Sequence, residues 1–327
     1  MIRARHLLLP AAAATAFVLA AARATPPEGR AAASAPAPVF EDAFWKHWGD
    51  GQAEMSGYDL VFPRYGQPRR GVAVAIFVTE TFSNSLRVKS DPGRHPKSDE
   101  YPVMKLNLVE DFATGIYDYN LMTSAFIALA PVNGRAAGSA TKVSFSSQEW
   151  CGNVYGQILF DPASARLTSH SYFDGEADQS HSLAVPADAL SGDALLLWAR
   201  GFSPPLLAPG QRREVPLVRS IETARLQHRP VQILRATLSR DAGTSRITVP
   251  AGSFEVERRT VAIADGPTWT MCVEAAEPHR IVAWETSEGE KASLLASDRI
   301  AYWKHNDPGG QALLAKLGLT PRGERMP

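Results

Sequence analysis

The sequence has few cysteines, no excess of either charge and no complete catalytic motif. Its 34 basic and 34 acidic residues give a formal charge of zero, so the charge balance indicates neither a nucleic-acid partner nor an anionic membrane surface. The G-x-S-x-G motif of many serine hydrolases is absent, as are the C-x-x-C and H-x-x-x-H spacings of common metal sites. We therefore expect no metal and no other cofactor, and the sequence favours a non-enzymatic function without deciding the question.

The two cysteines, Cys151 and Cys272, leave two interpretations open. In an oxidising compartment an even pair is a candidate disulfide, which in a loop this long would stabilise the fold by roughly 4–5 kcal/mol in the chain-entropy model. The alternative is two buried free thiols, because the sequence does not give the separation of the Cα atoms. A nucleophilic Cys151 is disfavoured, since no histidine lies near it in the sequence to activate the thiol.

Long apolar runs are also scarce, and the clearest one lies at the N-terminus. A positively charged start precedes an apolar stretch over residues 7–22, followed by small residues that fit a cleavage site. We predict a signal peptide over residues 1–24, cleaved after Ala24, and a disordered Ala/Pro-rich linker over residues 25–38. The mature protein is then expected in the periplasm or outside the cell, and not as an integral membrane protein.

Most of the remaining chain alternates polar and apolar residues between turns rich in glycine and proline. In residues 72–82 both alternating faces are largely apolar, which predicts a central strand. About a dozen such stretches predict a mainly β protein of antiparallel curved sheets or half-barrels, with a few short helices. We expect an N-terminal β half over residues 39–202 and a C-terminal β half with a short terminal helix over residues 211–327, joined by a connector.

Three segments have helical patterns. Residues 40–50 place aromatic side chains at helical spacing, and residues 311–317 precede Gly318. Residues 186–200 begin with proline, carry acidic residues early and end with Arg200 before a glycine, which predicts the longest helix of the three.

The stretch from Val143 to Gly156 changes from an alternating strand to a polar segment with a tryptophan, a cysteine and two glycines. If Val143 and Phe145 face the core, alternation sends Ser147, Glu149 and Cys151 to the same face. Because a buried charge costs several kcal/mol unless it is paired, such residues form either a structural ion-pair network or the floor of a polar site.

Other strands carry similar polar positions. Glu80 follows four apolar residues on one face of its strand, and Lys105 and Asn107 could face it across the sheet. Tyrosines and tryptophans in these strands could line a pocket for a lipid or a sugar, or could pack in the core. The candidate ligand-binding residues are Glu149, Glu80, Lys105, Asn107, Trp150, Tyr117 and Tyr119.

The second half carries a family resemblance. The stretches V-P-A-G-S-F-E-V-E-R-R-T-V (residues 249–261), W-T-M-C-V-E-A-A-E-P-H-R-I-V-A-W-E (269–285) and L-L-A-S-D-R-I-A-Y-W (294–303) resemble a bacterial periplasmic, β-rich family of unknown function. Their layout is similar to half-barrels of the lipoprotein-carrier type. The resemblance covers residues 213–303 and implies a curved antiparallel sheet that holds an acyl chain.

Three functions remain open at this point. The first is non-enzymatic binding of an apolar or amphipathic ligand, such as a lipid, or of a protein partner. The second is a secreted hydrolase that uses Glu149 with Glu80 or Asp118 as paired carboxylates, which requires both side chains on one concave surface. The third is a structural or interaction module without a pocket.

Overall fold

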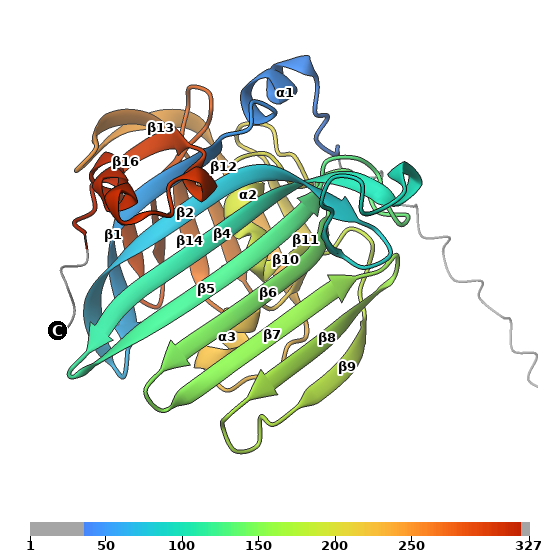
Figure 1. Cartoon of the computed structure of the whole chain (residues 1–327), viewed down its shortest axis with the longest axis horizontal. Coiled ribbons are helices and arrows are strands. Elements are labelled where there is room, and N and C mark those ends of the chain that lie inside the picture. The colour runs from blue at the N-terminus through green and yellow to red at the C-terminus, as the bar shows by residue number, and fades with distance from the viewer. Residues whose placement is uncertain (1–35, 322–327) are drawn as a thin grey trace, which may run out of the picture. The chain divides into compact units, whose positions relative to one another are not determined.

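The computed structural model describes residues 36–321, so the predicted signal peptide and most of the predicted linker lie outside the described residues. These residues form one large, curved and mostly antiparallel sheet that does not close on itself (Figure 1). The strands follow the order β10-β11-β12-β13-β14-β15-β16-β1-β2-β4-β5-β6-β7-β8-β9, with β3 added to β2. The mainly β prediction is confirmed.

Most strands follow one another as neighbours in the sheet. Their bounds are β1 (Ala53–Arg64), β2 (Gln67–Ser83), β3 (Val88–Lys89), β4 (Glu100–Thr114), β5 (Tyr117–Ala128), β6 (Ala140–Glu149), β7 (Gly152–Phe160), β8 (Ser164–Ser171), β9 (Gln179–Ala184), β10 (Leu190–Ser191), β11 (Arg212–Val218), β12 (Ile233–Val249), β13 (Gly252–Ile263), β14 (Thr268–Glu274), β15 (Ile281–Thr286) and β16 (Lys291–Ile300).

The helices are short. They are α1 (Asp42–Trp48), α2 (Leu195–Ala199) and α3 (Ile221–Leu226), with 3₁₀ turns η1 (Lys97–Asp99), η2 (Gly192–Ala194), η3 (Tyr302–Lys304) and η4 (Pro308–Leu317). The predicted helix over residues 186–200 is therefore mostly wrong. Leu190 and Ser191 instead pair in parallel with β11, and only five residues form an α-helix there. Residues 189–200 are almost entirely buried, so tertiary packing overrode the local helical pattern of the segment.

The two faces of the sheet differ in what they contact. The inner face carries the main hydrophobic core, and η2, α2 and α3 pack against it. In β2 the inner positions Ala73, Ala75 and Phe77 are buried, whereas Val72 on the outer face is exposed. The strand lies between β1 and β4, as its two apolar faces predicted.

Strands from both halves of the chain belong to the same sheet. β1 pairs with β2 on one side and with β16 on the other, so the first and last long strands are neighbours. Along residues 36–321, none of the helices combines the length and hydropathy needed to span a bilayer.

The outer face carries a smaller cluster of its own. Phe82, Tyr101, Val103 and Ala128 are buried there, with Phe126 packed against them. This cluster lies at the end of β2 and β4, next to the 84–99 loop that contains β3.

The disulfide prediction is wrong, because both cysteines are free. Cys151 is exposed in the turn between β6 and β7, and Cys272 is half-buried on β14. Strands β15, β16, β1, β2, β4 and β5 lie between β14 and β6 in the sheet. Since neighbouring strands are about 4.8 Å apart, this order keeps the two thiols far beyond bonding distance.

Candidate functional site

The predicted site residues divide between the two faces of the sheet. Tyr119 is buried on the inner face with Tyr117 packed against the same core, and the Glu149 side chain is 2% exposed. Glu80, by contrast, makes an ion pair with Lys105 on the outer face, where both line one groove.

The proposed pairing of Glu149 with Glu80 is wrong, because Glu80 lies on the outer face whereas the Glu149 side chain is buried on the inner face. Asp118 lies between the inward-facing Tyr117 and Tyr119 in β5, so it points outward by strand alternation. Asp118 and Glu149 nevertheless both line a recess of about 940 Å³ at the ends of these strands. The pairing of Glu149 with Asp118 therefore stays a prediction.

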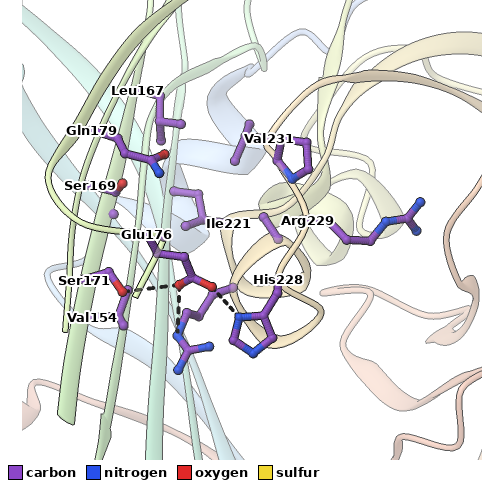
Figure 2. Close-up of a pocket in the computed structure, with 15 residues that line it drawn as sticks. Val154, Leu167, Ser169, Ser171, Glu176, Gln179, Ile221, His228, Arg229 and Val231 are labelled. Carbon is purple, nitrogen blue, oxygen red and sulfur yellow. Dashed lines mark hydrogen bonds and ion pairs between the residues drawn. The ribbon is translucent and has the colours of Figure 1, made fainter. Parts of the chain in front are cut away.

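An inner cleft lies between α3 and the inner face of β7, β8 and β9 (Figure 2). Its volume is about 280 Å³, at the small end for a ligand pocket. Apolar side chains and polar side chains both line it. The lining residues are Val154, Gly156, Leu167, Ser169, Ser171, Gly175, Glu176, Gln179, Ile221, Ala224, Arg225, His228, Arg229, Pro230 and Val231.

Arg225 is the central charged residue of the inner cleft. Its side chain is 4% exposed, and its Nη2 donates to Glu149 Oε1 at 3.4 Å. The guanidinium also lies over the Phe173 ring, 3.8 Å from the centroid. Its Nε and Nη1 nevertheless have no hydrogen-bond partner, and neither has Glu149 Oε2. The pair therefore leaves both donors and an acceptor unused in a buried place, which is costly.

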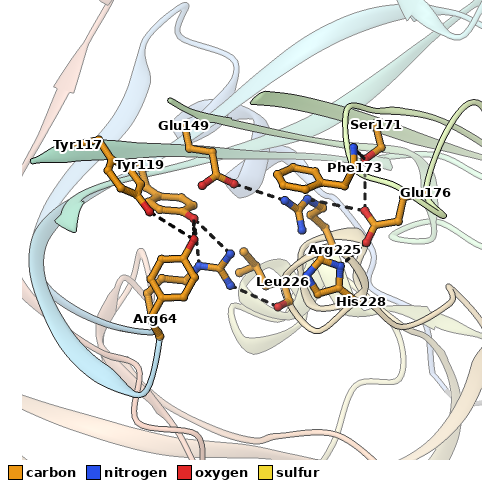
Figure 3. A network of polar contacts seen from close by, with 11 residues as sticks. Arg64, Tyr117, Tyr119, Glu149, Ser171, Phe173, Glu176, Arg225, Leu226 and His228 are labelled. Carbon is orange, nitrogen blue, oxygen red and sulfur yellow. Dashed lines mark hydrogen bonds and ion pairs between the residues drawn. The ribbon is translucent and has the colours of Figure 1, made fainter. Parts of the chain in front are cut away.

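The loop after β8 supplies the second carboxylate around this arginine. Glu176 lies 3.9 Å from Arg225 Nε and accepts a hydrogen bond from Ser171 Oγ at 3.3 Å. The same carboxylate contacts His228 Nδ1. Figure 3 shows these contacts as one continuous chain from Glu149 through Arg225 to His228.

Three tyrosines and an arginine extend this polar network toward the turn between β1 and β2. Tyr65 and Tyr119 share a hydrogen bond of 2.6 Å, and Tyr117 Oη donates to Tyr65 Oη at 3.5 Å. Arg64 donates to Tyr119 Oη from Nε and Nη2. Burial, together with the nearby Glu149, raises the pKa of Tyr119. Burial alone would also raise the pKa of Tyr65, but its hydrogen bonds with Tyr117 and Tyr119 lower it.

The local sequence explains why α3 sits against β7. Ser220 caps the helix by accepting from the Thr223 amide at 3.0 Å, and Asp193 accepts from the Ile221 amide at 3.0 Å. Ile221 then packs directly on Gly156, where an added Cβ would lie only 2.8 Å from Ile221 Cγ2. The glycine therefore permits the close approach that places Arg225 over the sheet.

Sequence reasoning missed α3 and the charged residues near it. The alternation of residues 213–221 predicts a strand, and no pattern in the sequence assigns Arg225 and His228 to an element. The available signal was Ser220 followed by the acidic Glu222, since serine is favoured directly before a helix and acidic residues are favoured in its first turn. Nothing in the sequence marked Glu176, which lies in a turn.

Trp150 lies at the rim of the molecule rather than in the inner cleft. It is 73% exposed, and its ring lies 6.2 Å from that of Tyr117. Among residues 36–321, no three His, Cys, Asp or Glu side chains lie together in a way that could hold a metal ion.

Comparisons with known proteins add little. No family model matches the sequence, and no curated protein matches it either. A crystal structure of a β-barrel-like protein of the domain of unknown function DUF1849, from Brucella abortus, aligns with 76% of this chain and 98% of its own. The two chains share 11% identity with a TM-score of 0.43, which carries no inference about function. The similarity to lipoprotein carriers has no support from a family match.

Proposed function

We propose that the protein binds a small amphipathic molecule in the inner cleft without transforming it, after export directed by residues 1–24. The observation that carries this proposal is the incomplete Arg225–Glu149 pair. Arg225 Nη1 and Glu149 Oε2 are buried and have no hydrogen-bond partner, and Arg225 lines the inner cleft. A ligand head group that accepts a hydrogen bond would satisfy Arg225 Nη1.

The rest of the cleft fits the apolar part of such a ligand. Val154, Leu167, Ile221 and Val231 form an apolar wall, and in Figure 2 the polar Glu176 and His228 lie apart from Leu167 and Val231. A short alkyl chain against this wall would place its head group near Arg225. The volume of about 280 Å³ limits the ligand to a small molecule rather than a long acyl chain.

Calorimetric titration of the mature protein with octanoic acid and octanol tests this proposal. We expect both to bind, octanoic acid more tightly because its carboxylate makes a charge-assisted hydrogen bond with Arg225 that the neutral hydroxyl of octanol cannot make. The double substitution Arg225→Met with Glu149→Gln should weaken octanoic acid at least about tenfold, or roughly 1.4 kcal/mol. This double variant removes both charges, so it leaves no uncompensated charge in the interior.

The matched control is Arg166→Met, because Arg166 is on β8 but outside the cleft and its side chain is 58% exposed. This variant should bind like the natural protein. Failure of the natural protein to bind either compound at millimolar concentration would favour a structural module instead. Unchanged binding by the double variant would show that the ligand does not use the Arg225–Glu149 pair.

A further inference from the structure

A second recess lies on the outer face of the sheet, on the opposite side from the inner cleft. It has a volume of about 440 Å³ and crosses β2, β4, β5 and β6. Its floor is polar, whereas its walls carry aromatic rings. We call it the outer groove, and its lining residues are Glu80, Phe82, Val88, Lys89, Lys105, Asn107, Ser124, Phe126, Lys142, Tyr302 and Trp303.

The floor contains a buried amide that is not fully satisfied. Asn107 is 9% exposed, and its Oδ1 has no hydrogen-bond partner. The outer face of a sheet normally lets such a group bond to water, so an orphaned amide oxygen here carries a desolvation cost. Beside it, Lys105 donates to Glu80 at 2.6 Å, and both side chains are mostly buried.

Lys142 supplies a charge that no carboxylate offsets. It is half-buried, and its Nζ donates to the Arg87 carbonyl at 3.1 Å. Within residues 36–321 it makes no ion pair. Burial lowers the pKa of its ammonium group. The three lysines of the groove outnumber the single glutamate, so the groove is positively charged.

Aromatic side chains line the walls of the outer groove and provide apolar surfaces for the ring of a bound ligand. Trp303 is 44% exposed, and together with Tyr302 it borders the groove from η3. Phe82 and Phe126 border the groove from the outer-face cluster, with their ring centroids 4.7 Å apart. Aromatic rings of this kind pack against the flat faces of small rings while polar groups contact the floor.

We infer that the outer groove binds a small hydroxylated organic anion of the sugar-acid class. Its carboxylate would pair with Lys142, which has no counter-ion, while its hydroxyls would donate to Asn107 Oδ1 and Glu80. Its ring face would lie against Trp303. This site is independent of the inner cleft, because the two lie on opposite faces of the sheet.

Calorimetric titration with glucuronate and with glucose tests the inference, since the two differ by one carboxylate. We expect the natural protein to bind glucuronate at least tenfold more tightly than glucose. Lys142→Gln should remove this preference, because glutamine retains a donor for the Arg87 carbonyl but carries no charge. Trp303→Ala, on the exposed wall, should weaken the binding of both sugars.

Lys97→Gln is the control, since it removes the same charge from a side chain that is 91% exposed and outside the groove. It should keep the natural preference for glucuronate. Thermal unfolding of each variant checks that the fold is intact, and Trp303→Ala provides the test if Lys142→Gln is unfolded. The inference is overturned if the natural protein does not distinguish the two sugars or if Lys142→Gln keeps the full preference.

Discussion

Two arginine–glutamate pairs inside the sheet are almost equally buried but differ in how completely they are satisfied. Arg200 and Glu54 have side chains 0% and 3% exposed, and they make two hydrogen bonds of 2.5 and 3.0 Å. Arg200 also donates to the Pro278 carbonyl and lies over the Phe77 ring. Arg200 Nε has no hydrogen-bond partner, but both Glu54 oxygens are bonded, and we call this the complete pair. The Arg225–Glu149 pair has one contact of 3.4 Å and leaves Arg225 Nε, Arg225 Nη1 and Glu149 Oε2 without hydrogen-bond partners, and we call it the incomplete pair.

This difference separates a structural ion pair from a candidate binding group. Burial alone does not distinguish them, because both pairs are out of water. A bidentate pair with additional hydrogen bonds compensates much of its own desolvation, whereas a single long contact does not. The incomplete pair also borders a cleft, whereas Arg200 lines no part of the inner cleft. The number of unsatisfied polar atoms beside a cleft, rather than burial, therefore makes Arg225 the candidate binding group.

Breaking the complete pair should have the largest effect on stability. Arg200→Met leaves Glu54 buried without its partner, and we expect a loss of about 3–5 kcal/mol in the free energy of unfolding. Urea denaturation measures this loss. The exposed pair Arg246–Glu255 is the control, since Arg246→Met should cost less than about 1 kcal/mol. A loss below about 1 kcal/mol for Arg200→Met would contradict the structural role.

The buried carboxyl groups of three glutamates differ from both ion pairs. Their raised pKa values favour the protonated, neutral form, so they do not need an arginine partner. Burial raises the pKa of Glu290 to about 8 and that of Glu222 to about 7, and it also raises the pKa of Glu110. Because the folded state holds these protons more tightly, their contribution to stability is complete below the unfolded pKa near 4.5. It is lost as the pH rises through about 7–8.

We therefore expect the free energy of unfolding to fall from pH 5 to pH 8. Glu290→Gln should flatten this slope by up to about 1.4 kcal/mol per pH unit, because glutamine has no proton to lose and can still accept from Trp284. Denaturation curves across this pH range provide the measurement. Stability that rises with pH, or an unchanged slope in the variant, would show that the interior does not hold protonated carboxyls.

Breaking the incomplete pair should have a smaller effect on stability than breaking the complete one. Arg225→Met loses the long contacts with Glu149 and Glu176 and leaves Glu149 buried, and we expect a loss of about 1–3 kcal/mol. The same urea experiment used for Arg200→Met gives the direct comparison. If Arg200→Met and Arg225→Met lose the same free energy of unfolding, the two ion pairs do not differ in their contribution to stability.

The smallest stability effect should come from the edge of the polar network. Tyr65→Phe removes the hydroxyl that shares a 2.6 Å hydrogen bond with Tyr119, at a position where the residue is 55% exposed. A loss of about 1 kcal/mol is expected, because water can replace part of the bond. A loss as large as that of Arg225→Met would show that the tyrosines support the inner cleft structurally.

Much of the fold could be predicted from local pattern. The alternation in residues 72–82 identified a central strand, and alternation around Val143 and Phe145 correctly placed Glu149 on the inner face. The same rule placed Glu80, Lys105 and Asn107 together on one face. It did not show that this is the outer face, because alternation relates residues within a strand and does not say which side carries the core.

The candidate site could be predicted only in part. Glu149, Tyr117 and Tyr119 were identified as polar and aromatic strand residues, but Arg225 and Glu176 come from a short helix and a turn. The separation of Cys151 from Cys272 likewise depends on strand order, which local sequence does not encode. Contacts between residues far apart in the chain follow from how the sheet is ordered and curved.

The sequence by itself determined the antiparallel strands, most of the turns and which side chains of a strand share a face, because these depend on a two-residue period and on turn chemistry. Only the tertiary structure decided which buried charges are satisfied. That outcome depends on α3 packing against Gly156 and on the order of the strands across the sheet. A hydrogen bond requires its two partners within about 3 Å, and for Arg225 and Glu149 only the folded sheet sets that distance.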